Sequence, residues 1–270
     1  MSPLWRDRVS IYLAPSRLAL VRRSRGPRAR VVAACELEVP AGAVGDLGPV
    51  LGRLAEALAD PAWHGALARV VVADHRWARY VVVPWQETRL DAEGHLSRAR
   101  FLLADAYGAA VADWAVTLAD TPPGRPGVAC AMPAMLRSSL EELLAPARLE
   151  LVSLQPRLVV AFNAWRHRLP ADNTWFVSLD EGLMSAVHLG GGAWDRIHLA
   201  LSSRDWRVEL ERLQAFGKLV RTGGDGGRML VDAPEWMRRT GIASPTVEWL
   251  EESDPRTPAH ELALLQRRTA

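Results

Sequence analysis

The chain repeats one pattern of short apolar segments, and this repetition constrains its fold more than any single motif. Residues 9–21 (VSIYLAPSRLALV) form two apolar segments around a tight turn, and a valine-rich segment follows at 28–40. Residues 170–201 again alternate three apolar segments around two turns, Asp180-Glu181-Gly182 and Gly190-Gly191-Gly192. Short apolar segments bounded by turn-forming residues predict antiparallel strands. The sequence therefore predicts two copies of a three-stranded meander, which is an internal repeat.

Helices and further strands are predicted between and after the two meanders. Helical spacing of apolar residues predicts helices over 45–63 (closing at Pro61), 91–108, 132–147, 156–169 and 203–220, with a short one ending near Gly241. Apolar runs predict strands over 68–74, 78–85, 113–120, 127–133, 148–156 and 228–234. This alternation is typical of the α/β class, with mixed sheets covered by helices. We expect a first lobe over 1–169, a second over 170–250 and a charged tail over 251–270.

Charge and cysteine content exclude several classes of protein. The chain has 33 basic and 31 acidic residues, and Lys218 is its only lysine. This balance argues against a nucleic-acid surface. Cys35 and Cys130 lie far apart without a Cys-x-x-Cys motif, which argues against a disulfide framework or a zinc site. The sequence has neither a signal peptide nor an apolar run long enough to cross a membrane, so a cytoplasmic location is expected.

The two predicted halves resemble the duplicated, ribonuclease H-like lobes of the actin-like superfamily of sugar kinases, heat-shock ATPases and actin. The stretches that carry the resemblance are VSIYLAPSRLALV, VVVPW, CAMPAMLRSSLEELL and WFVSLDEGLMSAVHL. Within the superfamily, the chain is similar to the cytoplasmic domain of type II secretion system protein L and to its relative, type IV pilus assembly protein M. The resemblance covers residues 5 to about 250, and it implies an actin-like fold of two lobes.

The resemblance also implies where a nucleotide would bind. In nucleotide-using members the first hairpin carries an aspartate that organises a metal-bound water, followed by glycines whose amides approach the phosphates. The corresponding residues here are Tyr12, Ala14 and Pro15. Tyr12 has no carboxylate and Pro15 has no N–H group. Only Ser16 and Arg17 remain to contact an anion, so this first phosphate site is expected to be lost.

The second hairpin keeps more of the superfamily's pattern. Asp180, Gly182 and Ser185 retain the aspartate, glycine and hydroxyl spacing and would bind a nucleotide if the cleft still does so. Leu183 and Met184 replace glycines of that pattern, and Glu181 adds negative charge where a phosphate would sit. The competing interpretation, which we prefer, is that this hairpin is a structural turn.

Other candidate motifs are weaker. The glycines of 223–227 precede a strand instead of following one, and Asp232-Ala233-Pro234 stand where the superfamily has adenosine-contacting glycines. Asp74-His75 could orient a nucleophile, and His188 with His198 could share a metal, but a turn histidine and a sheet-surface pair are preferred. Among the tryptophans, we expect Trp165 and Trp175 in the core. Partly exposed tryptophans are enriched in binding sites, and the candidates are Trp77, Trp85, Trp236 and Trp249.

The sequence predicts a non-catalytic cytoplasmic scaffold of a type IV pilus or type II secretion assembly platform, without a metal or other cofactor. The resemblance implies two partners, a bitopic inner-membrane platform protein and an assembly ATPase, with membrane contact only through a partner. An edge strand could accept a peptide from the anchor by strand addition, and a homodimer stays open. The membrane anchor is expected to be a separate protein. The segment ELALLQRRTA at the end of the sequence leaves the alternative that the chain is truncated before a membrane helix. The alternative functions are an actin-like ATPase or phosphotransferase, and an unrelated α/β binding module.

Overall fold

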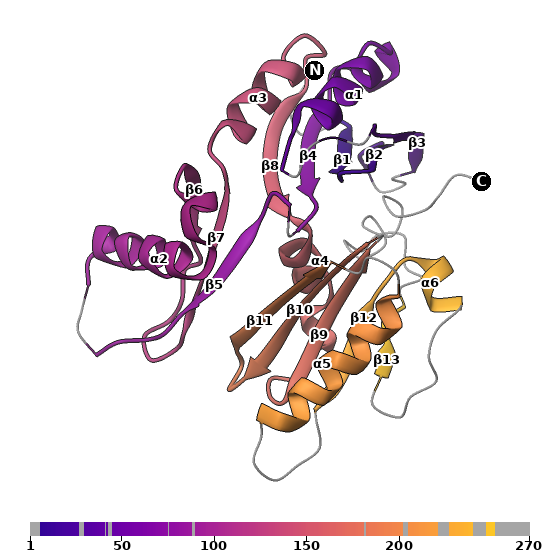
Figure 1. The fold of residues 1–270 in the computed structure, drawn as a ribbon. Coiled ribbons are helices and arrows are strands. Elements are labelled where there is room, and N and C mark those ends of the chain that lie inside the picture. The colour runs from indigo at the N-terminus through magenta and orange to yellow at the C-terminus, as the bar shows by residue number, and fades with distance from the viewer. Residues whose placement is uncertain are drawn as a thin grey trace. The chain divides into compact units, whose positions relative to one another are not determined.

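The computed structural model of the chain (Figure 1) describes residues 6–26, 30–40, 42, 45–74, 76–87, 90–180, 182–201, 205–220, 227–239 and 247–251, with the backbone alone at 218–220 and 236. These residues form two compact units. One contains the chain up to residue 77 together with 134–160, and the other contains 78–133 and 161–251. This division differs from the expected lobes, because residues 78–133 group with the second half of the chain. The predicted tail lies outside the described residues beyond 251.

The first unit is built on a five-stranded sheet with the order β3-β2-β1-β4-β8. The antiparallel pairs β1–β2 and β2–β3 form the meander, while β4 and β8 add parallel to β1. Helices α1 and α3 pack together and bury Leu54, Leu136 and Leu140. The bounds are β1 (Arg8–Leu13), β2 (Arg17–Arg23), β3 (Val31–Glu38), α1 (Gly48–Leu58), η2 (Pro61–Trp63), β4 (Leu67–Val72), α3 (Met135–Leu144) and β8 (Glu150–Pro156).

The second unit contains a sheet of the same design, with the order β11-β10-β9-β12-β13. Its meander is also antiparallel, and β12 and β13 add parallel to β9. The bounds are β9 (Thr174–Asp180), β10 (Leu183–Gly190), β11 (Ala193–Leu201), α5 (Trp206–Val220), β12 (Arg228–Asp232), α6 (Glu235–Arg239) and β13 (Val247–Trp249). The shared strand order confirms the predicted repeat and the α/β class.

A smaller sheet, β5-β7-β6, belongs to the second unit and separates the two copies of the repeat along the sequence. Its alternate residues face α2, where Ala99 and Leu103 pack against Val83, Ala129 and Ala131. The bounds are β5 (Arg79–Val83), α2 (Ala92–Tyr107), η3 (Gly108–Val111), β6 (Trp114–Leu118) and β7 (Gly127–Pro133). Helix α4 (Arg157–Trp165) and η4 (Arg166–Arg168) lead from the first sheet to the second along the chain.

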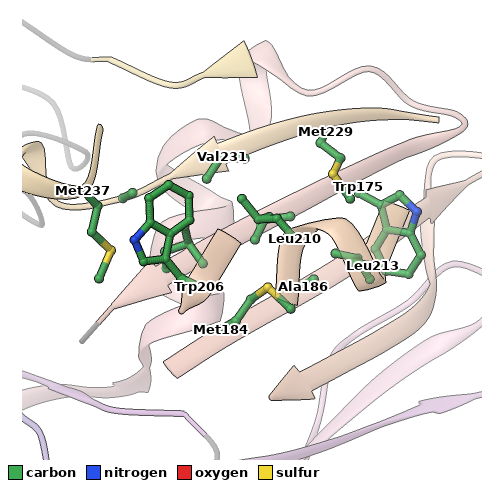
Figure 2. Close-up of a cluster of buried hydrophobic side chains, with 12 residues drawn as sticks. Trp175, Met184, Ala186, Trp206, Leu210, Leu213, Met229, Val231 and Met237 are labelled. Carbon is green, nitrogen blue, oxygen red and sulfur yellow. The ribbon is translucent and has the colours of Figure 1, made fainter. Parts of the chain in front are cut away.

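The core of the second unit lies between its large sheet and α5 (Figure 2). Leu210 and Leu213 of α5 are buried one turn apart and face Met184 and Val231 of the sheet. Strand β9 has every residue buried, which is expected for a central strand covered on both faces. These contacts pack β9 and β10 against α5.

The predicted tryptophan positions are confirmed in part. Trp165 and Trp175 are buried as expected, and Trp85 is 47% exposed. Trp77, one of the candidates for a partly exposed binding tryptophan, is instead buried, and its Nε1 donates to the Gly45 carbonyl at 3.3 Å. Trp249 is half-buried and its ring meets Trp206 edge-on at 5.6 Å. The side chain of Trp236 lies outside the described residues.

Strand β13 is absent from the sequence prediction. It has three residues, and such a short segment carries too little alternation to be distinguished from a loop. No helix in the described part of the chain has the length and apolar character that crossing a bilayer requires.

Asp91 caps α2 as its sequence position predicts. Its carboxylate accepts a hydrogen bond from Gly94 N at 2.7 Å, and Gly108 ends the helix with a positive φ of 64°. We expect Asp91→Ala to lower the free energy of unfolding by about 1 kcal/mol, because an N-terminal amide of the helix loses its acceptor. Chemical denaturation measures this change, and Asp91→Asn, which keeps an acceptor oxygen, should lose less.

Candidate functional site

The first hairpin, where the superfamily binds phosphate, closes through its own backbone. Ala14 N donates to Arg17 O at 2.8 Å, and Arg17 N donates to Ala14 O at 3.3 Å. Pro15 and Ser16 form the tip of the turn, and Ser16 is exposed. The Ser16 carbonyl accepts a hydrogen bond from Val39 N at 2.9 Å. The amides of Ala14 and Arg17 are therefore committed to the turn, and Pro15 has none to offer.

Beside this turn, the side chains of Tyr12 and Arg17 contact each other. Tyr12 is 1% exposed, and the Arg17 guanidinium carbon lies 5.2 Å from the centre of its ring. Arg17 is itself buried, and its Nη1 lies 3.5 Å from Glu36 Oε1 on the neighbouring strand β3. An arginine stacked on an aromatic ring beside a carboxylate has its charge balanced within the protein. A buried aromatic ring thus occupies the position to which the sequence resemblance assigns the aspartate of nucleotide-using members.

The second hairpin brings Asp180, Gly182 and Ser185 together at the end of β9. Asp180 pairs with Leu183 across the hairpin, and Ser185 pairs with Ser178 two residues further along. Asp180 and Ser185 are both buried, whereas Gly182 is exposed and has a φ of 69°. A positive φ favours glycine in such a turn. Glu181 lies outside the described residues. Ser16 and Arg17 belong to the other compact unit, so the structure groups the five predicted residues into two separate sets.

Asp232 has a structural contact that sequence reasoning missed. Its Oδ1 accepts a hydrogen bond from Trp165 Nε1 at 2.9 Å, and both side chains are buried. Asp232 ends β12 and Trp165 ends α4, so the bond joins two elements far apart in sequence. A buried indole N–H requires an acceptor, and that requirement was the only signal in the sequence.

Asp74 also has a different role from the one considered for it. Its Oδ2 accepts a hydrogen bond from Leu158 N at 2.8 Å, and the side chain is 2% exposed. Leu158 lies in the first turn of α4, where backbone amides have no partner within the helix. Asp74 therefore holds the start of α4 to the end of β4. His75, its suggested partner, lies outside the described residues.

The two histidines of the second sheet have different cross-strand neighbours. His188 Nδ1 lies 2.7 Å from Asp195 Oδ1, and its ring packs 5.0 Å from the Trp175 ring. His198 is opposite Ala186 on β10. Among the described residues, no group of three or more His, Cys, Asp or Glu side chains has the arrangement of a metal site. Within the predicted glycine loop, only Gly227 is described, and it has a φ of 81°.

A small cavity of about 260 Å³ adjoins the first hairpin within the first unit. Pro15 and Ser16 of the turn line it together with Asp46, Arg76 and Trp77. The charges of Asp46 and Arg76 on its wall are opposite, so the cavity has no excess of either charge. Its volume is below the range of about 300–1,000 Å³ that is usual for small-molecule sites.

No protein-family model matches the sequence, and no curated protein is recognisably similar to it in sequence. The structure is nevertheless similar to solved ones. The PilM–PilN type IV pilus biogenesis complex gives a TM-score of 0.58 at 15% identity, covering 84% of this chain and 81% of that chain. The cytoplasmic domain of EpsL, an inner-membrane component of the type II secretion system of Vibrio cholerae, gives 0.58 at 10% identity, covering 97% and 96%.

A third solved structure extends the comparison. A Bacteroides thetaiotaomicron protein of unknown function with an actin-like ATPase fold gives a TM-score of 0.55 at 9% identity, covering 87% of this chain and 85% of that chain. At these identities the similarity is one of fold. Together with the duplicated strand order of the two large sheets, it shows that the chain has the actin-like ATPase fold.

Proposed function

We propose that the chain is a non-catalytic, cytoplasmic scaffold of a type IV pilus or type II secretion assembly platform. The observation that carries the proposal is the first hairpin, where the Tyr12 ring and the Arg17–Glu36 pair occupy the place of a metal-organising carboxylate and free amides. A hairpin of this kind has no group to position a metal-bound water and no amide at Pro15 for a phosphate. Loss of these groups favours a binding role over phosphoryl transfer.

The comparisons support the kind of assembly. One neighbour is a pilus biogenesis complex, and another is the cytoplasmic domain of an inner-membrane component of a secretion system. By analogy, the partners of this chain are a bitopic inner-membrane platform protein and an assembly ATPase, and it reaches the membrane only through the platform protein. Fold similarity alone does not fix function, so the partners need a direct test.

The second candidate function is that of an actin-like ATPase or phosphotransferase. One observation favours it, since Asp180 and Ser185 are polar, buried and placed on one hairpin with Gly182 at its turn. Buried polar groups near a glycine turn are typical of phosphate sites. Titration with Mg-ATP distinguishes the two candidates, because only an ATPase or phosphotransferase is expected to bind the nucleotide.

Membrane association provides the test of the scaffold role. The tagged full-length chain is expressed in its source cells and in cells lacking the platform proteins, and membranes are separated by sedimentation. We expect the chain to sediment with membranes only when the platform is present, and crosslinking should recover a platform subunit or the assembly ATPase. A chain that stays in the soluble fraction of both strains and crosslinks to neither would contradict the proposal.

A further inference from the structure

Arginines are concentrated at the end of the β2–β3 hairpin where its two strands are joined. Ser24 N donates to Arg30 O at 3.0 Å, and Arg30 N donates to Ser24 Oγ at 3.1 Å, so Arg30 lies opposite Ser24. Arg23 and Arg25 are the neighbours of Ser24 in the sequence, and Arg25 and Arg30 are exposed. Three arginines therefore lie close together at this end of the first sheet.

Positive charge exceeds negative charge at this end of the sheet. Between residues 7 and 36 the sequence has no acidic residue. Arg22 Nε lies 2.8 Å from Asp7 Oδ2, and its Nη1 donates to the carbonyl of Ala62, two residues beyond Asp60. Arg6 Nη1 lies 3.1 Å from Glu150 Oε2. The arginines at this end are Arg6, Arg8, Arg22, Arg23, Arg25 and Arg30, and the carboxylates are Asp7, Asp60 and Glu150. Even if each carboxylate neutralises one arginine, three positive charges remain.

The helix that packs against β2 does not change this balance. Helix α1 contains one arginine and one glutamate, and these two side chains, Arg53 and Glu56, form an ion pair with each other. The acidic residues of β3, Glu36 and Glu38, lie at the opposite end of the strand, beside Arg17. The first sheet therefore has a basic end and an acidic end.

Next to the arginines, β3 presents two apolar side chains to solvent. Val31 is 45% exposed and Val32 is 54% exposed. Arg23 pairs with Val31 and Arg22 pairs with Ala33, so Val32 has no register partner on β2 and β3 contains a bulge. A bulge on an edge strand hinders pairing with a further strand. The exposed valines therefore favour contact with an apolar phase over the addition of a strand.

We propose that the basic hairpin surface, formed by Arg23, Arg25, Arg30, Val31 and Val32, contacts the anionic face of a lipid bilayer. Guanidinium groups bind phosphate oxygens through paired hydrogen bonds. Aliphatic side chains beside them enter the boundary between the headgroups and the acyl chains. The anionic lipids of a cytoplasmic leaflet attract clusters of arginine. The hairpin combines both kinds of contact at one end of one sheet.

The side chains of this surface favour lipid over nucleic acid. Single-stranded nucleic acids are bound by cations together with aromatic side chains on which the bases stack. The sequence has no aromatic residue between Tyr12 and Trp63, and the exposed apolar side chains beside the arginines are valines. Aliphatic side chains cannot stack on bases, whereas they do insert into a bilayer interface.

The lipid contact is expected to be weak and sensitive to salt. Two valines bury less apolar area than an acyl chain, and even a single acyl chain attaches a protein only marginally. Stable attachment needs a second anchor, and under the proposed function the platform protein is that anchor and brings the chain to the bilayer. The hairpin then determines which end of the first sheet meets the lipid. That orienting role rests on the proposed function, whereas the surface itself rests on the arginines and valines.

The test is flotation of the purified full-length chain with lipid vesicles at about 0.01 M salt, where the Debye length is about 30 Å. One set of vesicles contains equal parts of phosphatidylglycerol and phosphatidylcholine, and the other contains phosphatidylcholine alone. The test variant combines Arg25→Glu with Arg30→Glu. Its matched control combines Arg100→Glu with Arg166→Glu, which makes the same change in net charge at two exposed arginines of the second unit.

A third variant tests the apolar part of the surface. It combines Val31→Thr with Val32→Thr, which keeps the β-branched shape of both side chains and replaces one methyl group of each with a hydroxyl. Circular dichroism checks that all three variants fold.

We expect the wild-type chain to float with the phosphatidylglycerol vesicles only, and about 1 M salt to release it. The Arg25/Arg30 variant should bind these vesicles about tenfold or more weakly, and the Arg100/Arg166 variant by about twofold at most. The threonine variant should also bind more weakly than the wild type. No flotation with anionic vesicles, or equal weakening by the two arginine variants, would overturn the proposed surface.

Two further results separate this surface from other accounts. Tighter binding to a single-stranded oligonucleotide than to the anionic vesicles would assign the arginines to nucleic acid and overturn the lipid contact. The vesicles contain no platform protein, so a failure here together with platform-dependent sedimentation in cells would refute the lipid contact and leave the scaffold role intact. Flotation that depends on Arg25 and Arg30, without platform-dependent sedimentation, would support the surface and contradict the scaffold role.

Discussion

Replacing Trp175 with alanine is expected to lower the free energy of unfolding by about 3–5 kcal/mol. Trp175 is 2% exposed in the core shown in Figure 2, and its ring also packs 5.0 Å from His188. Removing the indole leaves a cavity between β9 and α5, and the loss is large against a total stability of about 5–15 kcal/mol. Trp175 lies in β9, the first strand of the β9–β10 hairpin that carries Asp180.

Urea denaturation followed by far-ultraviolet circular dichroism and by tryptophan fluorescence measures the change, and agreement of the two probes checks for a single transition. Trp85→Ala is the matched control, since it removes the same side chain from a position that is 47% exposed. We expect it to change the unfolding free energy by less than about 1 kcal/mol. Similar losses for the two tryptophans would contradict the core assigned to the second unit.

Asp232→Leu is the second change with a large expected effect, a loss of about 1–3 kcal/mol of unfolding free energy. The substitution leaves the buried Trp165 Nε1–H without the acceptor that now lies at 2.9 Å. If Asp232 instead served a nucleotide, the same change would alter ligand binding more than stability. The stability of the ligand-free protein therefore separates a structural role from a binding role.

A double-mutant cycle with Trp165→Phe isolates this hydrogen bond. In the double variant no indole N–H needs an acceptor, so the two losses should not add, and we expect a coupling energy of about 0.5–3 kcal/mol. Urea midpoints of the four proteins provide the values. Strict additivity would show that Asp232 stabilises the fold through its other contacts.

The repeated meander made the fold predictable from the sequence. In both halves, turn residues and apolar alternation specify the meanders β3-β2-β1 and β11-β10-β9 locally. The parallel addition of β4 to β1 and of β12 to β9 is a pairing between strands distant in sequence, and the sequence did not predict it. The short strand β13 and the buried position of Trp77 were not predictable in this way, because both depend on contacts with residues distant in sequence. The grouping of residues 78–133 with the second half likewise depends on tertiary packing.

The candidate site was predictable as a set of residue types but not as a set of contacts. Proline at position 15 removes a phosphate-binding amide whatever the tertiary structure. The stacking of Arg17 on Tyr12 and the bonds made by Asp74 and Asp232 join elements that are far apart in the chain or face each other across a turn. The sequence of one protein contains no signal for such contacts between distant residues. From the sequence, the carboxylates that are buried in the structure could therefore be considered only as candidate functional groups.

Titration of the purified chain with Mg-ATP tests the central claim, the absence of a working nucleotide site, most directly. Calorimetry and thermal unfolding are followed up to millimolar nucleotide, with Asp180→Asn as the matched variant. A site filled to one hundred times its Kd would raise stability by about 2.7 kcal/mol. We predict no heat of binding and no shift in Tm for either protein. A clear shift in the wild type that Asp180→Asn abolishes would contradict the scaffold account and establish the second hairpin as a nucleotide site.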